Sequence, residues 1–283
     1  MAERLKEFSR KKEFLICVDS DGCAMDTMDI KHIRCFGPCM VREWGLERWQ
    51  ALILDRWNEI NLYTMTRGIN RFCGLAMALR EIHETYCPID GIREFEAWTR
   101  QAATLSGPAL REAASATANP CFFKALSWSN QVNSLINDLS QEDRKPFEGV
   151  AQGLEAAREF ADVALVSSAN PEAVVQEWEH CGLLDYVDVL CCQDAGTKAH
   201  CIGVLRAQGY DPKHILMVGD APGDQRAAAQ NGVYFYPILV KEERKSWREF
   251  KTTALNRFRQ EDYDSYGAQV LLRFLDNLGQ EPE

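Results

Sequence analysis

The sequence lacks a long apolar run and a surplus of basic residues. Its longest hydrophobic stretches fall well short of the roughly 20 residues that a membrane span needs, and the charged N-terminal stretch MAERLKEFSRKKEF has no apolar signal core. The net charge is -10, with 32 Lys and Arg against 42 Asp and Glu. A nucleic-acid partner would require clustered positive charge. We therefore expect a cytoplasmic protein that binds neither membranes nor nucleic acids.

The sequence also lacks any regular pattern of cysteines, although it contains eleven of them. A disulfide framework is not expected in a chain of 283 residues without a secretory signal. The tightest group with metal-ligand character is His32, Cys35 and Cys39, which has no fourth ligand and no CxxC pair. We therefore interpret the cysteines as small apolar side chains rather than as a zinc site.

What the sequence does contain is a series of short apolar segments that alternate with helical patterns. Five segments are predicted as buried strands: Phe14–Val18, Val163–Val166, Val187–Cys191, Ile215–Val218 and Val233–Tyr236. Helix signals follow the second to fourth strands, such as Asn170-Pro171 as N-cap and first helical residue, and Asn231-Gly232 as a helix end. Continuous apolar strands alternating with helices indicate an α/β fold with a Rossmann-like, doubly wound parallel sheet.

Residues 25–146 show helical periodicity almost without a strand signal. In LERWQALILDRWNEINLY and INRFCGLAMALREI, apolar side chains recur at intervals of three and four residues. We expect an all-helical cap domain at 25–146, inserted into a core formed by residues 1–24 and 147–240. Beyond residue 240, two amphipathic segments predict a helical C-terminal appendage at 241–283 that packs on the core.

The first predicted strand ends in two carboxylates, in the sequence Asp19-Ser20-Asp21-Gly22. Residues i and i+2 of an extended segment point to the same side, about 6.6 Å apart. Two ionised carboxylates at that separation repel each other by roughly 2–3 kcal/mol at an effective dielectric constant near 20. A bound cation or a carboxyl that keeps its proton would offset this repulsion.

Chemistry-bearing residues also follow the other predicted strands, and in open parallel sheets ligands bind at the carboxyl ends of the strands. The set at this edge is Asp19, Asp21, Ser167, Ser168, Lys198, Asp220 and Asp224. Carboxylates suit Mg²⁺, while a Ser ahead of a helix N-terminus and a Lys suit a phosphate group. One Asp can attack phosphorus while a second transfers protons. Each residue alone could simply cap a turn or helix, but their joint occurrence favours phosphoryl chemistry.

The chain resembles the haloacid dehalogenase-like superfamily over about residues 13–35 and 145–238. Four motifs of that superfamily occur in order: Asp-x-Asp-Gly at Asp19–Gly22, a strand-ending Ser at Ser167, a Lys at Lys198, and Gly-Asp-x-x-x-Asp at Gly219–Asp224. The predicted helical insertion matches the place of the superfamily's cap domain. The phosphatase and β-phosphoglucomutase-like branch is the most similar, because Asp21 stands where dehalogenases and phosphonatases carry another residue.

The resemblance implies a role for each motif residue. Asp19 would be the nucleophile that forms an aspartyl-phosphate, and Asp21 the general acid and base. Ser167 would bind the transferring phosphoryl group, and Lys198 would complete the catalytic set by steadying the nucleophile and the phosphoryl oxygens. The resemblance also implies Mg²⁺ as cofactor, on Asp19, the main-chain carbonyl of Asp21 and Asp220, with Asp224 in support.

The resemblance implies a Mg²⁺-dependent phosphatase that acts on a small phosphorylated metabolite. Arg71 in the cap, Ser168 and Asn170 are candidates for substrate binding, and either Ser167 or Ser168 would contact the phosphate. A sugar phosphomutase is the alternative, weakened because Lys31 stands where many such mutases have His. A catalytically silent binding protein on the same scaffold is a third reading.

Overall fold

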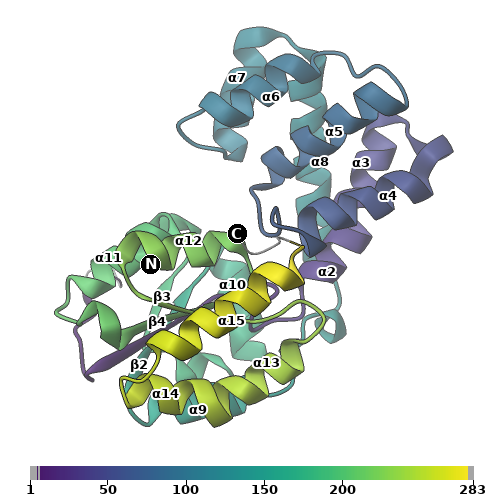
Figure 1. Ribbon diagram of the computed structural model, residues 1–283. Helices are drawn as coiled ribbons and strands as arrows, with labels where there is room; N and C mark the ends of the chain where they lie inside the picture. The colour runs from purple at the N-terminus through teal and green to yellow at the C-terminus, as the bar shows by residue number, and fades with distance from the viewer. Residues whose placement is uncertain (1–4, 6, 280–283) are drawn as a thin grey trace. The chain divides into compact units, whose positions relative to one another are not determined.

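The computed structural model describes residues 5 and 7–279, and these form two compact units. One unit, here called the sheet unit, contains the chain up to Met28 and from Gln141 onward. The other, the helical unit, is Asp29–Ser140. Figure 1 shows the strands and helices of both along the chain. Within the described residues, no helix is both long and apolar enough to cross a membrane.

The sheet unit is built on a parallel sheet in the order β3-β2-β1-β4-β5, five strands within the described part of the chain. Their bounds are β1 Phe14–Val18, β2 Ala161–Val166, β3 Val189–Cys191, β4 Ile215–Gly219 and β5 Tyr234–Pro237. All five predicted strands are present, and β1 has the predicted bounds. Strand β3 begins two residues later than predicted, because the backbone N–H of Val187 donates to the carbonyl of Leu184 (3.0 Å) and closes the 3-10 turn Leu184–Tyr186. The doubly wound α/β fold is confirmed.

Helices cover both faces of this sheet. Their bounds are α9 Val150–Arg158, α10 Pro171–His180, α11 Lys198–Arg206, α12 Pro222–Asn231, α13 Glu243–Glu249, α14 Leu255–Arg259 and α15 Asp264–Asn277. Ile16 and Val18 of β1 face α9, α10, α13 and α14, whereas Leu15 and Cys17 face α11 and α12. Every residue of β1 is buried, as expected of a strand with helices on both sides.

The predicted helix start at Asn170 and the predicted helix end at Asn231-Gly232 are both present. The Asn170 side chain accepts hydrogen bonds from the backbone N–H groups of Glu172 and Ala173, and Pro171 is the first residue of α10. Helix α12 ends at Asn231, and Gly232 follows at φ 65°, a left-handed conformation that glycine adopts without strain.

The helical unit contains seven α-helices within the described residues. They are α2 Met28–Lys31, which begins on the last residue of the sheet unit, α3 Gly37–Trp44, α4 Gln50–Asn58, α5 Arg71–Thr85, α6 Ile92–Gln101, α7 Gly107–Thr117 and α8 Pro120–Asn137. Single π-helical turns at His32–Phe36 and Glu59–Tyr63 follow α2 and α4. The aromatic side chains at helical spacing, such as Trp57, Phe72 and Trp128, form the core of this unit, as the periodicity predicted.

The C-terminal segment, residues 238–279, belongs to the sheet unit. The first predicted amphipathic segment is α13, a π-helical turn at Phe250–Ala254, and α14. Its apolar residues Trp247, Phe250 and Phe258 are completely buried in the core on one face of the sheet. The second amphipathic segment is α15, which packs beside β5.

Candidate functional site

The loop after β1 is held by backbone hydrogen bonds. The backbone N–H of Asp19 donates to the carbonyl of Val218 on the neighbouring strand β4 (3.0 Å). The carbonyl of Ser20 accepts from three successive backbone N–H groups, those of residues 23–25 (2.8–3.2 Å). Gly22 lies at φ 80°, where any other residue would be strained. The loop therefore turns tightly at the carboxyl end of the central strand.

Strand β4 presents its motif at the same edge. Asp220 directly follows Gly219, the last residue of the strand, and Asp224 lies in the first turn of α12. The Asp224 carboxylate accepts a hydrogen bond from the backbone N–H of Ala221 (3.1 Å). A Cβ atom on Gly219 would lie 2.4 Å from this carboxylate, so glycine is required for the close approach.

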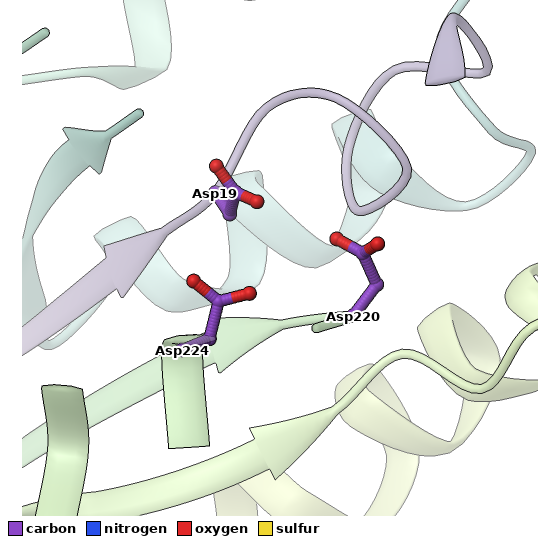
Figure 2. A group of neighbouring side chains, drawn as sticks. All are labelled: Asp19, Asp220 and Asp224. Carbon is purple, nitrogen blue, oxygen red and sulfur yellow. The ribbon is translucent and has the colours of Figure 1, made fainter. Parts of the chain in front are cut away.

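Three carboxylates meet between these two loops. Oxygen atoms of Asp19, Asp220 and Asp224 lie within 4.8 Å of one another, and all three residues are buried. Figure 2 shows the three side chains around one space, from the end of β1, the end of β4 and the start of α12. The Lys198 ammonium group lies 2.8 Å from an Asp19 oxygen and 2.5 Å from an Asp224 oxygen. Lys198 begins α11, so residues far apart in the sequence form one charged cluster.

The charges of this cluster perturb one another. Burial raises the pKa of Asp19 well above its usual range; Lys198 opposes this rise, and the neighbouring Asp224 and Asp220 add to it. Burial alone would lower the pKa of Lys198, but its contacts with Asp19 and Asp224 raise it instead, so the lysine stays charged. One lysine thus faces three carboxylates, and the site carries an excess of negative charge.

The donor set fits a hard divalent cation. Mg²⁺ prefers oxygen ligands and commonly takes only one or two carboxylates from the protein. Asp19, Asp220 and Asp224 offer such oxygens at close range, in a place where added positive charge would relieve their repulsion. The predicted residues Asp19, Asp220 and Asp224 are therefore brought together as carboxylates suited to a metal ion.

Asp21 has a different environment. Its carboxylate accepts a hydrogen bond from the hydroxyl of Thr27 (2.5 Å), a buried residue of the same loop region. Asp21 itself is partly exposed. A carboxyl group that is oriented by a hydroxyl and still reaches solvent is suited to giving and taking protons.

The residues after β2 separate into a buried and an exposed group. Ser167 is buried; its backbone N–H donates to the carbonyl of Cys191 (2.8 Å), and its hydroxyl oxygen accepts from the N–H of Ala169 (3.1 Å). This contact leaves the hydroxyl hydrogen available to a ligand. Ser168 is exposed, and the side chain of the exposed Asn170 caps α10.

Arg71 lies in the helical unit, at the start of α5. Its guanidinium donates hydrogen bonds to Asn133 (2.7 Å) and Ser129 (3.3 Å) and lies 5.0 Å from the centre of the Phe36 ring. Burial lowers the pKa of Arg71. Within its own unit this side chain therefore links α5 to α8.

Two tryptophans at the loop after β1 were missed by the sequence analysis. The indole N–H of Trp178 donates to the Ser20 hydroxyl, and that of Trp247 donates to the carbonyl of Cys23, both over 2.9 Å. The paired residues are 158 and 224 positions apart. Helical periodicity indicates that such tryptophans are buried, but it does not indicate which polar group they meet.

Comparison with known proteins identifies the family to which this chain is similar. The family model described as haloacid dehalogenase-like hydrolase matches residues 91–238, just over half of the chain. The match includes Ser167, Lys198, Asp220 and Asp224 but begins after Asp19. A search of curated proteins gave no significant match.

Several solved structures are similar to this chain. A haloacid dehalogenase-like hydrolase from Streptococcus pneumoniae has 13% identity and a TM-score of 0.50, covering 83% of this chain and 90% of its own. A candidate phosphoglycolate phosphatase from Lactobacillus delbrueckii subsp. bulgaricus has 13% identity, coverage of 80% and 85%, and a TM-score of 0.49. A candidate β-phosphoglucomutase from Thermotoga maritima has 16% identity, coverage of 79% and 84%, and a TM-score of 0.45.

The solved structures and the family model support different conclusions about this chain. At 13% identity the Streptococcus pneumoniae structure supports the fold alone, whereas the family model includes three of the four motifs found at the strand ends. Since that model matches more than half of the chain, the chain belongs to the haloacid dehalogenase-like hydrolases and is an enzyme of the hydrolase class.

Proposed function

We propose that this enzyme is a Mg²⁺-dependent phosphatase that hydrolyses a small phosphorylated metabolite through an aspartyl-phosphate intermediate. The observation that carries the proposal is the cluster of three buried carboxylates within 4.8 Å, with Lys198 between Asp19 and Asp224. A fold that needed only to end two strands would not bury this much like charge in one place.

Asp19 is the proposed nucleophile. One of its carboxylate oxygens attacks phosphorus, the bond from phosphorus to the ester oxygen breaks, and an acyl phosphate forms on Asp19. Lys198, 2.8 Å from the Asp19 carboxylate, holds that group in place and adds positive charge beside the phosphoryl oxygens. The hydroxyl of Ser167, at the end of the adjacent strand β2, donates to a phosphoryl oxygen.

Asp21 is the proposed proton carrier. In the first step it donates a proton to the leaving alcohol, and in the second it takes one from the water that attacks the acyl phosphate. Inorganic phosphate leaves and the Asp19 carboxylate is restored. Thr27 orients Asp21 through the 2.5 Å hydrogen bond, which keeps the carboxyl directed in both steps.

Mg²⁺ would be held by Asp19, Asp220 and Asp224, together with the main-chain carbonyl of Asp21 that the family resemblance implies. When bound, the cation supplies positive charge that favours ionised Asp19 and stabilises negative charge on the phosphoryl oxygens. Ser168, Asn170 and, from the helical cap, Arg71 are proposed as substrate-binding residues.

The test is phosphate release from a panel of small phosphate esters with Mg²⁺ and with EDTA. Wild type is compared with Asp19→Asn and with Asp188→Asn, a control that makes the same chemical change just before β3, away from the carboxylate cluster. Release that depends on Mg²⁺ and Asp19 but not on Asp188 would support the proposal. An isomeric sugar phosphate formed only with a bisphosphate activator would indicate a mutase, and no turnover of any ester would contradict the phosphatase assignment.

A further inference from the structure

Two indole groups hold the loop after β1, one at each end of its turn. Trp178 of α10 donates to the hydroxyl of Ser20, between the two proposed reacting carboxylates Asp19 and Asp21. Trp247 of α13 donates to the carbonyl of Cys23, the residue after the turn glycine. Both indoles are completely buried, so water does not replace these donors.

Trp247 is itself held firmly. A Cβ atom on Gly153 of α9 would lie 2.9 Å from its ring. The indole therefore packs against α9 at a position where a larger residue would collide with it. The ring of Phe250 packs edge-on against it at 5.3 Å. The donor is therefore fixed before it meets the loop.

Cys23 also connects the loop to the other half of the site. Its thiol donates to the carbonyl of Val218 (3.5 Å), the residue that also pairs with the backbone of Asp19 and lies two positions before Asp220. Movement of the Cys23 peptide would therefore disturb both halves of the carboxylate cluster.

We propose that Trp247 is a positioning residue, through which the C-terminal segment sets the geometry of the Asp19–Gly22 loop. The inference rests on the proposed function in that Asp19 and Asp21 are taken as the reacting groups. Without the indole N–H, the buried carbonyl of Cys23 would lose this hydrogen bond. The loop would then shift or loosen until the carbonyl met another donor. Displacements of about 1 Å at reacting groups cost up to roughly a hundredfold in rate.

The test compares Trp247→Phe, which keeps an aromatic ring and removes the donor, with Tyr236→Phe. The control removes a buried hydrogen bond to Ser246, the residue next to Trp247, without touching the loop. Two readings are taken: kcat and KM for phosphate release, and hydrogen exchange of the backbone amides in peptide 19–25. The second reading does not depend on activity.

We expect Trp247→Phe to lower kcat by roughly tenfold with KM within about twofold, and to accelerate exchange in peptide 19–25, while Tyr236→Phe does neither. Equal effects of the two variants on kcat and on loop exchange would overturn the proposal. Should wild type show no phosphatase activity, the proposed function fails. Hydrogen exchange in peptide 19–25 then decides by itself whether Trp247 positions the loop. Should Trp247→Phe not fold, Trp247→benzothienylalanine keeps the indole shape, replaces its N–H by sulfur, and is judged by the same readings.

Discussion

Replacement of Asp19 by Asn is expected to stabilise the metal-free protein at pH 7, although it removes the proposed nucleophile. Repulsion from Asp220 and Asp224, each within 4.8 Å, amounts to about 7 kcal/mol at an effective dielectric constant near 20, and attraction by Lys198 at 2.8 Å to about 6 kcal/mol. These terms nearly cancel, so the cost of burying the charge decides the balance. Asn keeps the shape of the side chain and removes that cost.

The sign and size of the effect follow from proton linkage. Burial raises the pKa of Asp19 in the folded protein, so the folded state binds this proton more tightly than the unfolded state, whose pKa is about 3.9. Stability therefore falls as the pH rises from about 4 toward the folded-state pKa. The advantage of Asp19→Asn should be absent near pH 4 and reach at most about 4 kcal/mol at pH 7.

The assay is urea unfolding of both proteins in EDTA at several pH values between 4 and 7, repeated with Mg²⁺. The control is Asp188→Asn: burial raises the pKa of Asp188, but the Val163 N–H and Lys11 outweigh burial and hold that pKa below its usual range. This contribution is present at pH 7 and lost as the pH falls, so the control should be destabilised at pH 7.

Mg²⁺ should reduce the stability advantage of Asp19→Asn at pH 7, since only wild type offers the complete set of carboxylates. At a hundred times the dissociation constant, a bound ion adds about 2.7 kcal/mol to the stability of wild type. Asp19→Asn that is no more stable than wild type at pH 7 in EDTA, or whose advantage does not shrink toward pH 4, would refute the electrostatic reasoning.

Two further changes test the site. Gly219→Ala would place a methyl group 2.4 Å from the Asp224 carboxylate and is expected to lower Mg²⁺ affinity at least about tenfold, measured by calorimetry; Gly223→Ala, where a Cβ has no neighbour within 4 Å, is the control and should bind Mg²⁺ normally. Asn170→Ala should cost about 1 kcal/mol of stability through loss of the α10 cap, whereas Asn170→Asp keeps the cap. A KM that rises in both Asn170 variants would show that this side chain also binds substrate, and a KM unchanged in both would limit it to capping.

Local patterns were sufficient for the elements of the sheet and for the edge at which the motifs gather. Strand β1 appears with the predicted bounds because a strand buried on both faces requires an unbroken apolar run. Asn170 caps its helix because the capping geometry involves only the next two or three residues. The carboxyl ends of parallel strands share one edge, so the residues that follow them were expected together.

The sequence by itself thus determined the fold class, the presence of a sheet-forming and a helical part, and which carboxylates gather at the carboxyl edge of the sheet, because each depends on spacing within a few turns of chain. Only the tertiary structure decided that Lys198 lies between Asp19 and Asp224, that burial raises the pKa of Asp19, and that Trp247 meets the Cys23 carbonyl. The physical reason is that desolvation and hydrogen bonding depend on what surrounds a group in space, and those surroundings come from segments up to 224 residues away.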